Sequence, residues 1–177
     1  MGMALYLIRH PAPQHVPGIC YGQLDLPLAE PVTDAAHWLA QLPARFACYT
    51  SPLQRCRLLA EALQTPTLID ARLLELDFGR WEGQQWDAIG AAALDAWITS
   101  DYAADAHGGE SLGALHARTA AWASDAARQP LPVVAVTHAG VIRSLLAQQH
   151  GWSTTQAFDH PLPFGSVTLL DWKPSPP

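Results

Sequence analysis

The chain has 177 residues, of which 49% are hydrophobic and 15% are charged, and its formal net charge is -6. This length and composition predict one globular domain over residues 1–177 and argue against disorder. An acidic chain with a single lysine and no basic run is not typical of a protein whose main partner is nucleic acid or an anionic membrane. Neither a signal peptide nor an apolar run of membrane-spanning length is found, so we expect a cytoplasmic protein.

Predicted strands and helices alternate along the chain. Short apolar runs predict strands over residues 5–10, 46–50, 67–69, 132–137 and 167–172. Apolar residues at helical spacing predict helices over residues 32–42, 52–63, 86–97, 112–127 and 141–149. Residues 11–31, rich in Pro and Gly, predict a long loop, and residues 174–177 a frayed tail. The alternation predicts an α/β fold, a three-layer sandwich with a mostly parallel central sheet and helices on both faces.

Two histidines each close a predicted strand. His10 directly follows Arg9, and His138 precedes Ala139 and Gly140, small residues that open the next predicted helix. The carboxyl ends of parallel strands border the crevice in which α/β proteins bind ligands. An arginine beside one imidazole and the free N–H groups of a helix start beside the other favour an anion, which indicates a phosphate site.

Two further residues could act at the same edge of the sheet. Ser51 and Pro52 form a helix start after the strand at 46–50, which places Arg55 in the first turn of that helix. Arg57 lies about 200° around the helix from Arg55, so both cannot reach one pocket. Glu75 stands among apolar and aromatic neighbours, an environment that suits a carboxyl group to acid catalysis.

The remaining titratable and aromatic residues favour a structural interpretation. The three cysteines have no C-x-x-C spacing, so neither a disulfide framework nor a zinc site is predicted. The other histidines are scattered and indicate no metal site. We expect three tryptophans of the central region to belong to the core. The residues concerned are Cys20, Cys48, Cys56, His15, His37, His107, His116, His150, His160, Trp81, Trp86 and Trp97.

Taken in order, these motifs resemble the histidine phosphatase superfamily, which has the phosphoglycerate-mutase-like fold. The resemblance runs from Leu5 to about Ser144, with Arg9-His10 similar to the R-H-G motif and residues 51–55 similar to S-x-L-x-R. It implies a single histidine phosphatase domain that needs no metal and no cofactor. The implied roles are nucleophile for His10, general acid for Glu75, and phosphate binding for Arg9, Arg55 and His138.

The chain also departs from the family pattern. Pro11 replaces the usual glycine after the histidine, and the usual downstream asparagine of the phosphate loop is absent. The loop at 17–28, together with residues 77–83 and 108–112, resembles the alpha-ribazole phosphatase branch. This resemblance implies a phosphomonoester hydrolase with a phosphohistidine intermediate. Its expected substrate is a small phosphorylated metabolite, alpha-ribazole phosphate in cobalamin nucleotide-loop assembly.

Three alternatives stay open. Mutases of this fold are longer and use an arginine pair for the substrate carboxylate, whereas residues 76–136 hold only the separated Arg80, Arg118 and Arg128. Protein-phosphohistidine phosphatases are also compact but tend to lack the segment around Glu75. A non-catalytic sensor of a phosphorylated ligand would need neither His10 nor Glu75. The sequence predicts no oligomeric state. Asp77 and Glu82 lie near Glu75 in the sequence but do not hold the aligned place, and the carboxylates to test after Glu75 are Asp77 and Glu110.

Overall fold

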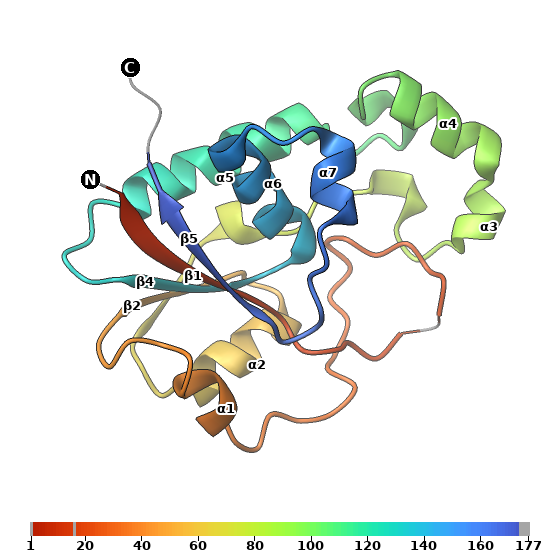
Figure 1. Cartoon of the computed structure of the whole chain (residues 1–177). Coiled ribbons are helices and arrows are strands. Elements are labelled where there is room, and N and C mark those ends of the chain that lie inside the picture. Colours follow the sequence, from red (N-terminus) through yellow and green to blue (C-terminus); the bar gives the residue numbers. More distant parts are fainter. Residues whose placement is uncertain (1, 16, 174–177) are drawn as a thin grey trace.

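The computed structural model describes residues 2–15 and 17–173, and a five-stranded sheet forms its centre (Figure 1). The strands are β1 (Met3–Arg9), β2 (Ala47–Thr50), β3 (Thr67–Ile69), β4 (Val133–Thr137) and β5 (Val167–Trp172). Their order across the sheet is β3-β2-β4-β1-β5, and only the pair of β1 and β5 is antiparallel. The prediction of an α/β fold with a mostly parallel central sheet is confirmed.

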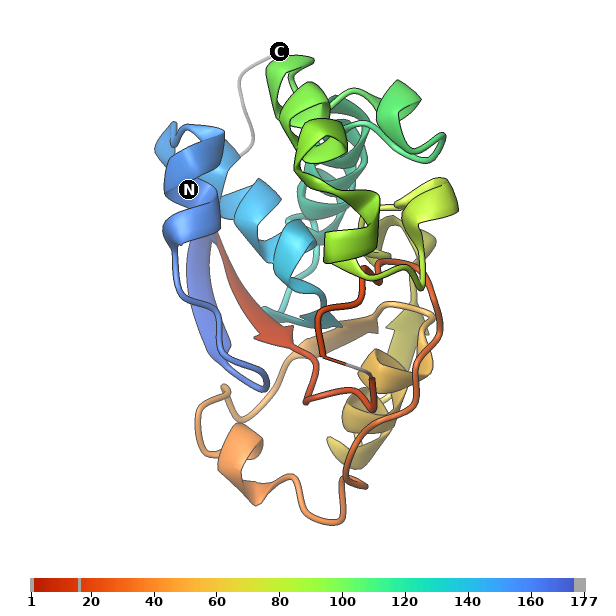
Figure 2. The same cartoon turned by 90° about the vertical axis from the view of Figure 1, so that its right-hand side faces the viewer.

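Helices cover both faces of the sheet, as predicted. The helices are α1 (Ala36–Leu39), α2 (Gln54–Ala62), α3 (Trp86–Ile89), α4 (Ala91–Thr99), α5 (Leu112–Ala126), α6 (Ala139–His150) and α7 (Thr154–Asp159). Short 3-10 turns are η1 (Ala71–Leu73), η2 (Gly79–Trp81) and η3 (Ala104–Ala106). Helices α1 and α2 lie on one face, and α5, α6 and α7 lie on the other (Figure 1). Helices α3 and α4 stand outside these layers, next to the loop of residues 11–31 (Figure 2).

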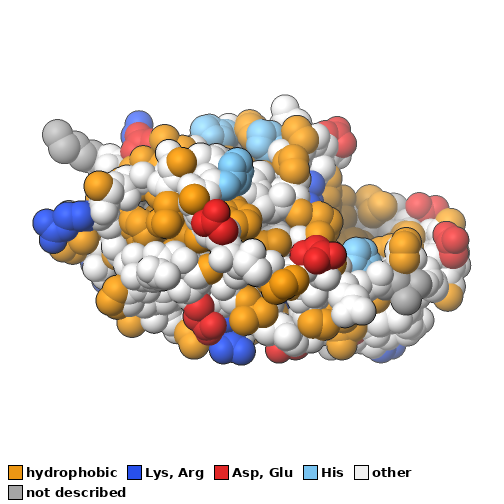
Figure 3. Space-filling model, turned by 90° about the horizontal axis from the view of Figure 1, so that it is seen from below, with side chains coloured by type: hydrophobic (Ala, Val, Ile, Leu, Met, Phe, Trp, Pro, Cys, Tyr) orange, Lys and Arg blue, Asp and Glu red, His pale blue; other side chains and the backbone are white. Residues whose placement is uncertain are grey.

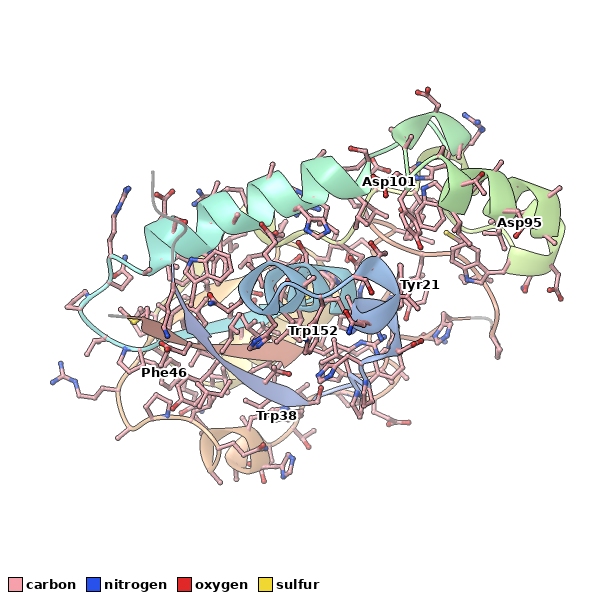
Figure 4. All side chains as sticks on the ribbon, turned by 45° about the horizontal axis from the view of Figure 1, so that its top comes forward. Tyr21, Trp38, Phe46, Asp95, Asp101 and Trp152 are labelled. Carbon is pink, nitrogen blue, oxygen red and sulfur yellow. The ribbon has the colours of Figure 1, made fainter. Side chains whose placement is uncertain are left out.

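Each face of the sheet packs into its own hydrophobic core. Along β4, Val133 and Ala135 face the core under α5 and α6, whereas Val134 and Val136 face the core over α2. All residues of β4 are buried, as expected for a central parallel strand covered on both sides. Figure 4 shows the two sides, with Trp38 and Phe46 near α1 and Trp152 among the helices of the opposite layer.

The outer surface around α1 and α2 is mixed in character. Figure 3 looks onto this face and shows hydrophobic side chains interspersed with polar ones. Leu58 and Leu68, each at least 40% exposed, belong to this kind of scattered apolar surface, which is normal in globular proteins. Within residues 2–15 and 17–173, no helix has the length and apolarity needed to cross a bilayer.

Two helix predictions need correction. The helix predicted over 32–42 is reduced to α1, because only Ala35 becomes buried there and Leu39 is 42% exposed. A short segment with so little packing does not sustain a longer helix. The helix predicted over 86–97 is broken at Gly90, whose φ of 86° ends α3 and lets α4 begin in a new direction.

The other boundaries lie near their predicted positions. Helix α2 begins at Gln54, two residues after the predicted start at Pro52, and Ser51 Oγ accepts a hydrogen bond from the backbone N–H of Leu53 at 3.4 Å. Residues 11–15 and 17–31 lie in the predicted long loop, apart from isolated bridges of Pro13 with Leu28 and Ile19 with Gln85, and residue 16 lies outside the described residues. The predicted frayed tail at 174–177 lies outside the described residues.

Candidate active site

The carboxyl ends of β2, β4 and β1 lie side by side, and the predicted site residues meet at this edge. His10 directly follows β1, and its backbone N–H donates to the carbonyl of Thr137, the last residue of β4, at 3.0 Å. His138 follows Thr137, and Ser51 follows β2, where its N–H donates to the carbonyl of Val136. Residues distant in the sequence therefore converge because their strands are neighbours in the sheet.

A backbone carbonyl fixes the tautomer of His10. Its imidazole is buried, and Nδ1 lies 2.7 Å from the carbonyl oxygen of Pro11. Because a carbonyl oxygen can only accept, Nδ1 carries the proton and Nε2 keeps its lone pair. Burial, together with the charges of Arg55 and Arg9, lowers the pKa of His10 to about 3, so the ring is neutral at physiological pH. Proline at position 11 supplies this carbonyl as well as glycine would.

His138 packs edge-on against His10. The ring centroids are 5.2 Å apart, and His138 is fully buried at the start of α6. Its Nε2 lies 2.8 Å from Ser51 Oγ and 3.5 Å from the sulfur of Cys56. Burial first, and then the positive charge of Arg55, keep the pKa of His138 well below its ordinary value. Both imidazoles of the site are therefore neutral.

Arg55 is a fully buried cation held by backbone carbonyls. Nη1 donates to the carbonyl of Leu24 at 2.7 Å and Nη2 to the carbonyl of Gly22 at 2.6 Å. Its Nε is buried without a hydrogen-bond partner. Arg57 lies outside the site and pairs with Glu61, as the angle between the two arginines predicts. A buried guanidinium with an unused N–H group is suited to bind an anion.

Arg9 supplies a second cation from the last residue of β1. Its guanidinium carbon lies 4.0 Å from the ring centre of Phe164, in a cation–π arrangement. Nη1 donates to the carbonyl of Leu162, and Nε is buried without a partner. Burial lowers the pKa of Arg9 from its ordinary value. Arg9 thus resembles Arg55, because its guanidinium is hydrogen-bonded to a backbone carbonyl and its Nε has no hydrogen-bond partner.

Glu75 reaches the site from the segment between η1 and η2. Oε1 accepts the N–H of Leu76 at 2.8 Å, and Oε2 accepts the N–H of Gly140 in the first turn of α6 at 2.9 Å. A Cβ atom at position 140 would collide with the Glu75 carboxylate, so this glycine makes room for it. Arg118 Nη2 and Gln23 Nε2 each donate to the Glu75 carbonyl at 3.1 Å, which fixes the backbone.

The other carboxylates considered from the sequence are engaged elsewhere. Asp77 Oδ1 accepts the N–H of Gly79, and Glu110 forms an ion pair with Arg118 at 2.6 Å. Glu82 accepts backbone N–H groups of the loop at 22–24. Among the carboxylates that the structure describes, Glu75 is the one that lines the cavity.

A cavity of about 410 Å³ opens at this edge of the sheet and has two distinct parts. We call the first part the polar end; its members are Arg9, His10, Tyr21, Arg55, Glu75 and Arg143. We call the second part the aromatic wall, a chain of rings with centroids 4.9 to 5.8 Å apart: Phe78, Trp86, Trp97, Tyr102 and Phe158. His138 contacts His10 but does not line the cavity.

This arrangement corrects one expectation and leaves another in place. Trp81 and Trp97, which are 5% and 7% exposed, belong to the core as expected, although Trp97 also lines the cavity. Trp86, expected to be a core residue, is only partly buried against that core and lines the cavity. His116 of α5, expected to be structural, also lines the cavity. In the described part of the chain, no group of three or more His, Cys, Asp or Glu side chains is placed to hold a metal ion.

A family model agrees with this geometry. Residues 5–177 match the model of the histidine phosphatase superfamily, branch 1. The chain belongs to this superfamily. Its fold is that of the phosphoglycerate-mutase-like proteins, and the family supports a phosphatase activity.

Named relatives of this histidine phosphatase differ in what they act on. Phosphoserine phosphatase 1 of Hydrogenobacter thermophilus is 28% identical over 154 residues, 80% of this chain and 73% of that protein. A phosphoglycerate mutase of Thermus thermophilus is 30% identical, with a TM-score of 0.77 over 96% of this chain and 94% of that one. A mycobacterial glucosyl-3-phosphoglycerate phosphatase in complex with VO3 is 27% identical, with a TM-score of 0.76 over 94% and 92% of the two chains.

Two residues of the polar end of this histidine phosphatase were not predicted from the sequence. Arg143 lies on α6, four residues after Ala139 and hence on the same helix face, and its Nε is buried without a partner. Helical spacing from Ala139 could have indicated it. Tyr21 comes from the long loop, and its ring centre lies 5.3 Å from the Arg55 guanidinium. No local pattern in the sequence marks this position.

Proposed function

We propose that this protein hydrolyses phosphomonoesters without a metal ion, through a phosphohistidine formed on His10. The observation that carries the proposal is the state of that imidazole, which is neutral and directs its lone pair from Nε2 because Nδ1 donates to the backbone. A nucleophile in this state needs no proton removed before it attacks phosphorus. Arg9 and Arg55 line the cavity beside it, and their terminal N–H groups that are not bound to backbone carbonyls can bind the phosphate oxygens.

The reaction then has two balanced steps. Nε2 of His10 attacks phosphorus in line with the leaving oxygen; the P–N bond forms as the P–O bond breaks, and a protonated Glu75 gives its proton to the leaving alcohol. Water next attacks phosphorus, Glu75 takes its proton, and the P–N bond breaks to restore neutral His10. Arg9 and Arg55 offset the charge on the equatorial oxygens in both steps, and His138 supports the phosphate site from beside His10.

The aromatic wall favours a substrate that carries an aromatic group. We propose alpha-ribazole phosphate, a nucleotide whose base could stack on these rings while its phosphate occupies the polar end. A cavity of about 410 Å³ has room for more than a phosphate. Arg80 and Arg118, weighed from the sequence as carboxylate ligands, are bound to protein groups outside the cavity, which disfavours a mutase.

Arg143 supports a second candidate substrate. Its side chain lines the cavity, its Nε is buried without a hydrogen-bond partner, and its Nη2 donates a long 3.3 Å hydrogen bond to the carbonyl of His160. A guanidinium in this state could bind the carboxylate of a small phosphomonoester such as phosphoserine. The two candidates make opposite demands on the cavity, because one needs the aromatic wall and the other needs Arg143.

A phosphate-release screen separates these possibilities. The substrates are alpha-ribazole phosphate, phosphoserine, 3-phosphoglycerate and a phosphohistidine protein, each assayed with and without EDTA. We expect the highest kcat/KM on alpha-ribazole phosphate and no loss in EDTA. A preference for phosphoserine that Arg143→Ala abolishes would establish the second candidate. Binding of phosphate without turnover of any substrate would contradict hydrolysis and favour a sensor.

A further inference from the structure

The Glu82 carboxylate is saturated by backbone N–H groups from two segments. Oε2 accepts from Gly22 at 2.9 Å and from Leu24 at 3.2 Å. Oε1 accepts from Gln23 at 2.9 Å and from Phe78 at 3.1 Å. Within the described residues it has no lysine or arginine within ion-pair distance. Three successive N–H groups of the long loop thus converge on one negative charge, an arrangement typical of a backbone anion nest.

The same loop residues hold Arg55 with their carbonyl groups. The peptide unit that joins Gly22 to Gln23 accepts from Arg55 Nη2 at 2.6 Å through its oxygen and donates to Glu82 at 2.9 Å through its nitrogen. One peptide dipole therefore lies between the two charges, with its negative end on the guanidinium and its positive end on the carboxylate. The carbonyl of Leu24, whose own N–H also donates to Glu82, accepts from Arg55 Nη1 at 2.7 Å.

We propose that Glu82 is a positioning residue for phosphate binding, which acts on Arg55 through this peptide unit. A carboxylate in direct contact with Arg55 would occupy the N–H groups that the phosphate needs. Two peptide carbonyls hold the guanidinium by one N–H on each terminal nitrogen, and Glu82 polarises the Gly22 carbonyl through the N–H of Gln23 on the far side of that peptide unit. The buried cation is stabilised without being neutralised, and the second N–H on each terminal nitrogen remains for the phosphate. This inference rests on the proposed role of Arg55 as a phosphate ligand.

Gly22 is the residue that permits this contact. A Cβ atom there would collide with the carbonyl oxygen of Leu76 and would approach Glu82 Oε1 to 2.9 Å. The loop therefore packs its backbone directly against the segment at 76–82. The same loop also holds Glu75, because Gln23 Nε2 donates to the Glu75 carbonyl. Glu82 thus orders the one loop that touches both the phosphate ligand and the proposed acid.

The alternative is that Glu82 merely ties the loop to the segment at 78–83. A double-mutant cycle distinguishes the two, because residues that act through one another show non-additive effects. The variants are Glu82→Gln, Arg55→Ala and their combination, with Glu61→Gln on the exposed side of α2 as the matched control. The readout is the Kd of inorganic phosphate by calorimetry and the Ki of orthovanadate. Neither needs turnover.

We expect Glu82→Gln to weaken phosphate binding about tenfold in the native background, the effect of one charge-assisted hydrogen bond, with the control unchanged. In the Arg55→Ala background we expect less than a twofold further change. An equal loss in both backgrounds, or no loss in either, would overturn the proposal. If Glu82→Gln does not fold, Glu82→Asp takes its place in the cycle. We then expect a smaller loss of phosphate affinity, and an equal loss in both backgrounds or no loss in either would again overturn the proposal.

The cycle also separates this inference from the proposed function. If Arg55→Ala alone leaves phosphate affinity unchanged, the assignment of Arg55 as a phosphate ligand fails, and the inference fails with it. If Arg55→Ala weakens binding but the cycle is additive, the phosphate site stands and only the role of Glu82 is wrong. Neither of these two results depends on the outcome of the substrate screen.

Discussion

The polar end and the aromatic wall of the cavity are built in different ways. The polar end takes Arg9, His10 and Arg55 from the carboxyl ends of neighbouring strands or the helix after them, where backbone hydrogen bonds fix each side chain. The aromatic wall comes mostly from residues 78–102, outside the three layers, and its rings are held by packing against one another. The sheet thus determines where chemistry can occur, and the added segments shape what else can bind.

The two parts should also respond differently to mutation. At the polar end, buried charges and imidazoles depend on specific partners, so a single change removes a function that no neighbour can replace. Along the aromatic wall, apolar contacts are spread over several rings, so the loss of one is tolerated. Variants of Arg9, His10, Arg55 and Glu75 should therefore impair every substrate, whereas variants of the wall or of Arg143 should change only the preference between substrates.

The largest effect is expected from His10→Ala. Phosphate release from p-nitrophenyl phosphate should fall to background, because His138, the imidazole that packs against His10, does not line the cavity. An acid-labile, base-stable phosphoenzyme should form on the native protein and be absent from the variant. Unchanged turnover in His10→Ala would exclude the phosphohistidine mechanism and remove the distinction between the two parts of the cavity.

Glu75→Gln should have the next largest effect, and that effect should depend on the leaving group. General acid catalysis is typically worth about 10² to 10⁴ in rate, and an alkoxide needs the proton whereas nitrophenolate does not. Rapid-mixing measurements of the first step should show a large loss for an alkyl phosphate and a small one for p-nitrophenyl phosphate. Asp77→Asn, two residues away and outside the cavity, is the matched control. An unimpaired burst with the alkyl phosphate would exclude Glu75 as the acid.

The polar end was largely predictable because its residues sit at predicted strand ends. Neighbouring parallel strands end at one edge, so His10 and His138 had to meet once β1 and β4 paired. The prediction of Glu75 depended on the family resemblance, because its carboxylate reaches the site only by packing against Gly140, which belongs to α6. Tyr21 could not be predicted, because the path of a 21-residue loop depends on tertiary contacts such as those with Glu82.

The aromatic wall was not predictable for a different reason. In the sequence, a tryptophan at helical spacing shows the same pattern whether it faces a core or a cavity. Here the direction of these side chains depends on the break between two helices at Gly90. Asp101 and Tyr102 both have φ near 55° to 58°, a left-handed conformation that turns the chain after α4 and that non-glycine residues adopt rarely. Local propensity does not indicate either turn, so the direction of these side chains follows from packing alone.

Acid unfolding should report the buried state of His10. Its pKa is about 3 in the folded protein against 6.5 ordinarily, so the unfolded chain binds about one more proton between these values. The stability that the neutral ring contributes is complete above pH 6.5 and is lost as the pH falls toward 3. His10→Asn, which keeps a donor for the Pro11 carbonyl, should reduce the slope of unfolding free energy against pH by about 1.4 kcal/mol per unit. Urea titrations from pH 4 to 6 measure this slope. Equal slopes would show that the polar end does not hold His10 neutral.

The smallest effect is expected at the aromatic wall. Phe158 is 48% exposed and contacts Tyr102 with ring centroids 5.8 Å apart, so Phe158→Ala should leave the fold intact. One aromatic contact is worth about 0.5–1.5 kcal/mol, which predicts a loss of roughly 2- to 12-fold in kcat/KM for alpha-ribazole phosphate, mainly through KM.

Phosphoserine, which has no ring, tests whether this effect is confined to the wall. Its kcat/KM should be unchanged in Phe158→Ala, and Leu68→Ala, the truncation of a more exposed apolar side chain on β3, should change kcat/KM for neither substrate. An equal loss on both substrates would mean that the wall also orients His10 or Glu75, because only a change at the reacting groups lowers turnover regardless of the rest of the substrate. In that case the two parts of the cavity would act as one site, and the division of labour between the sheet edge and the added segments would not hold.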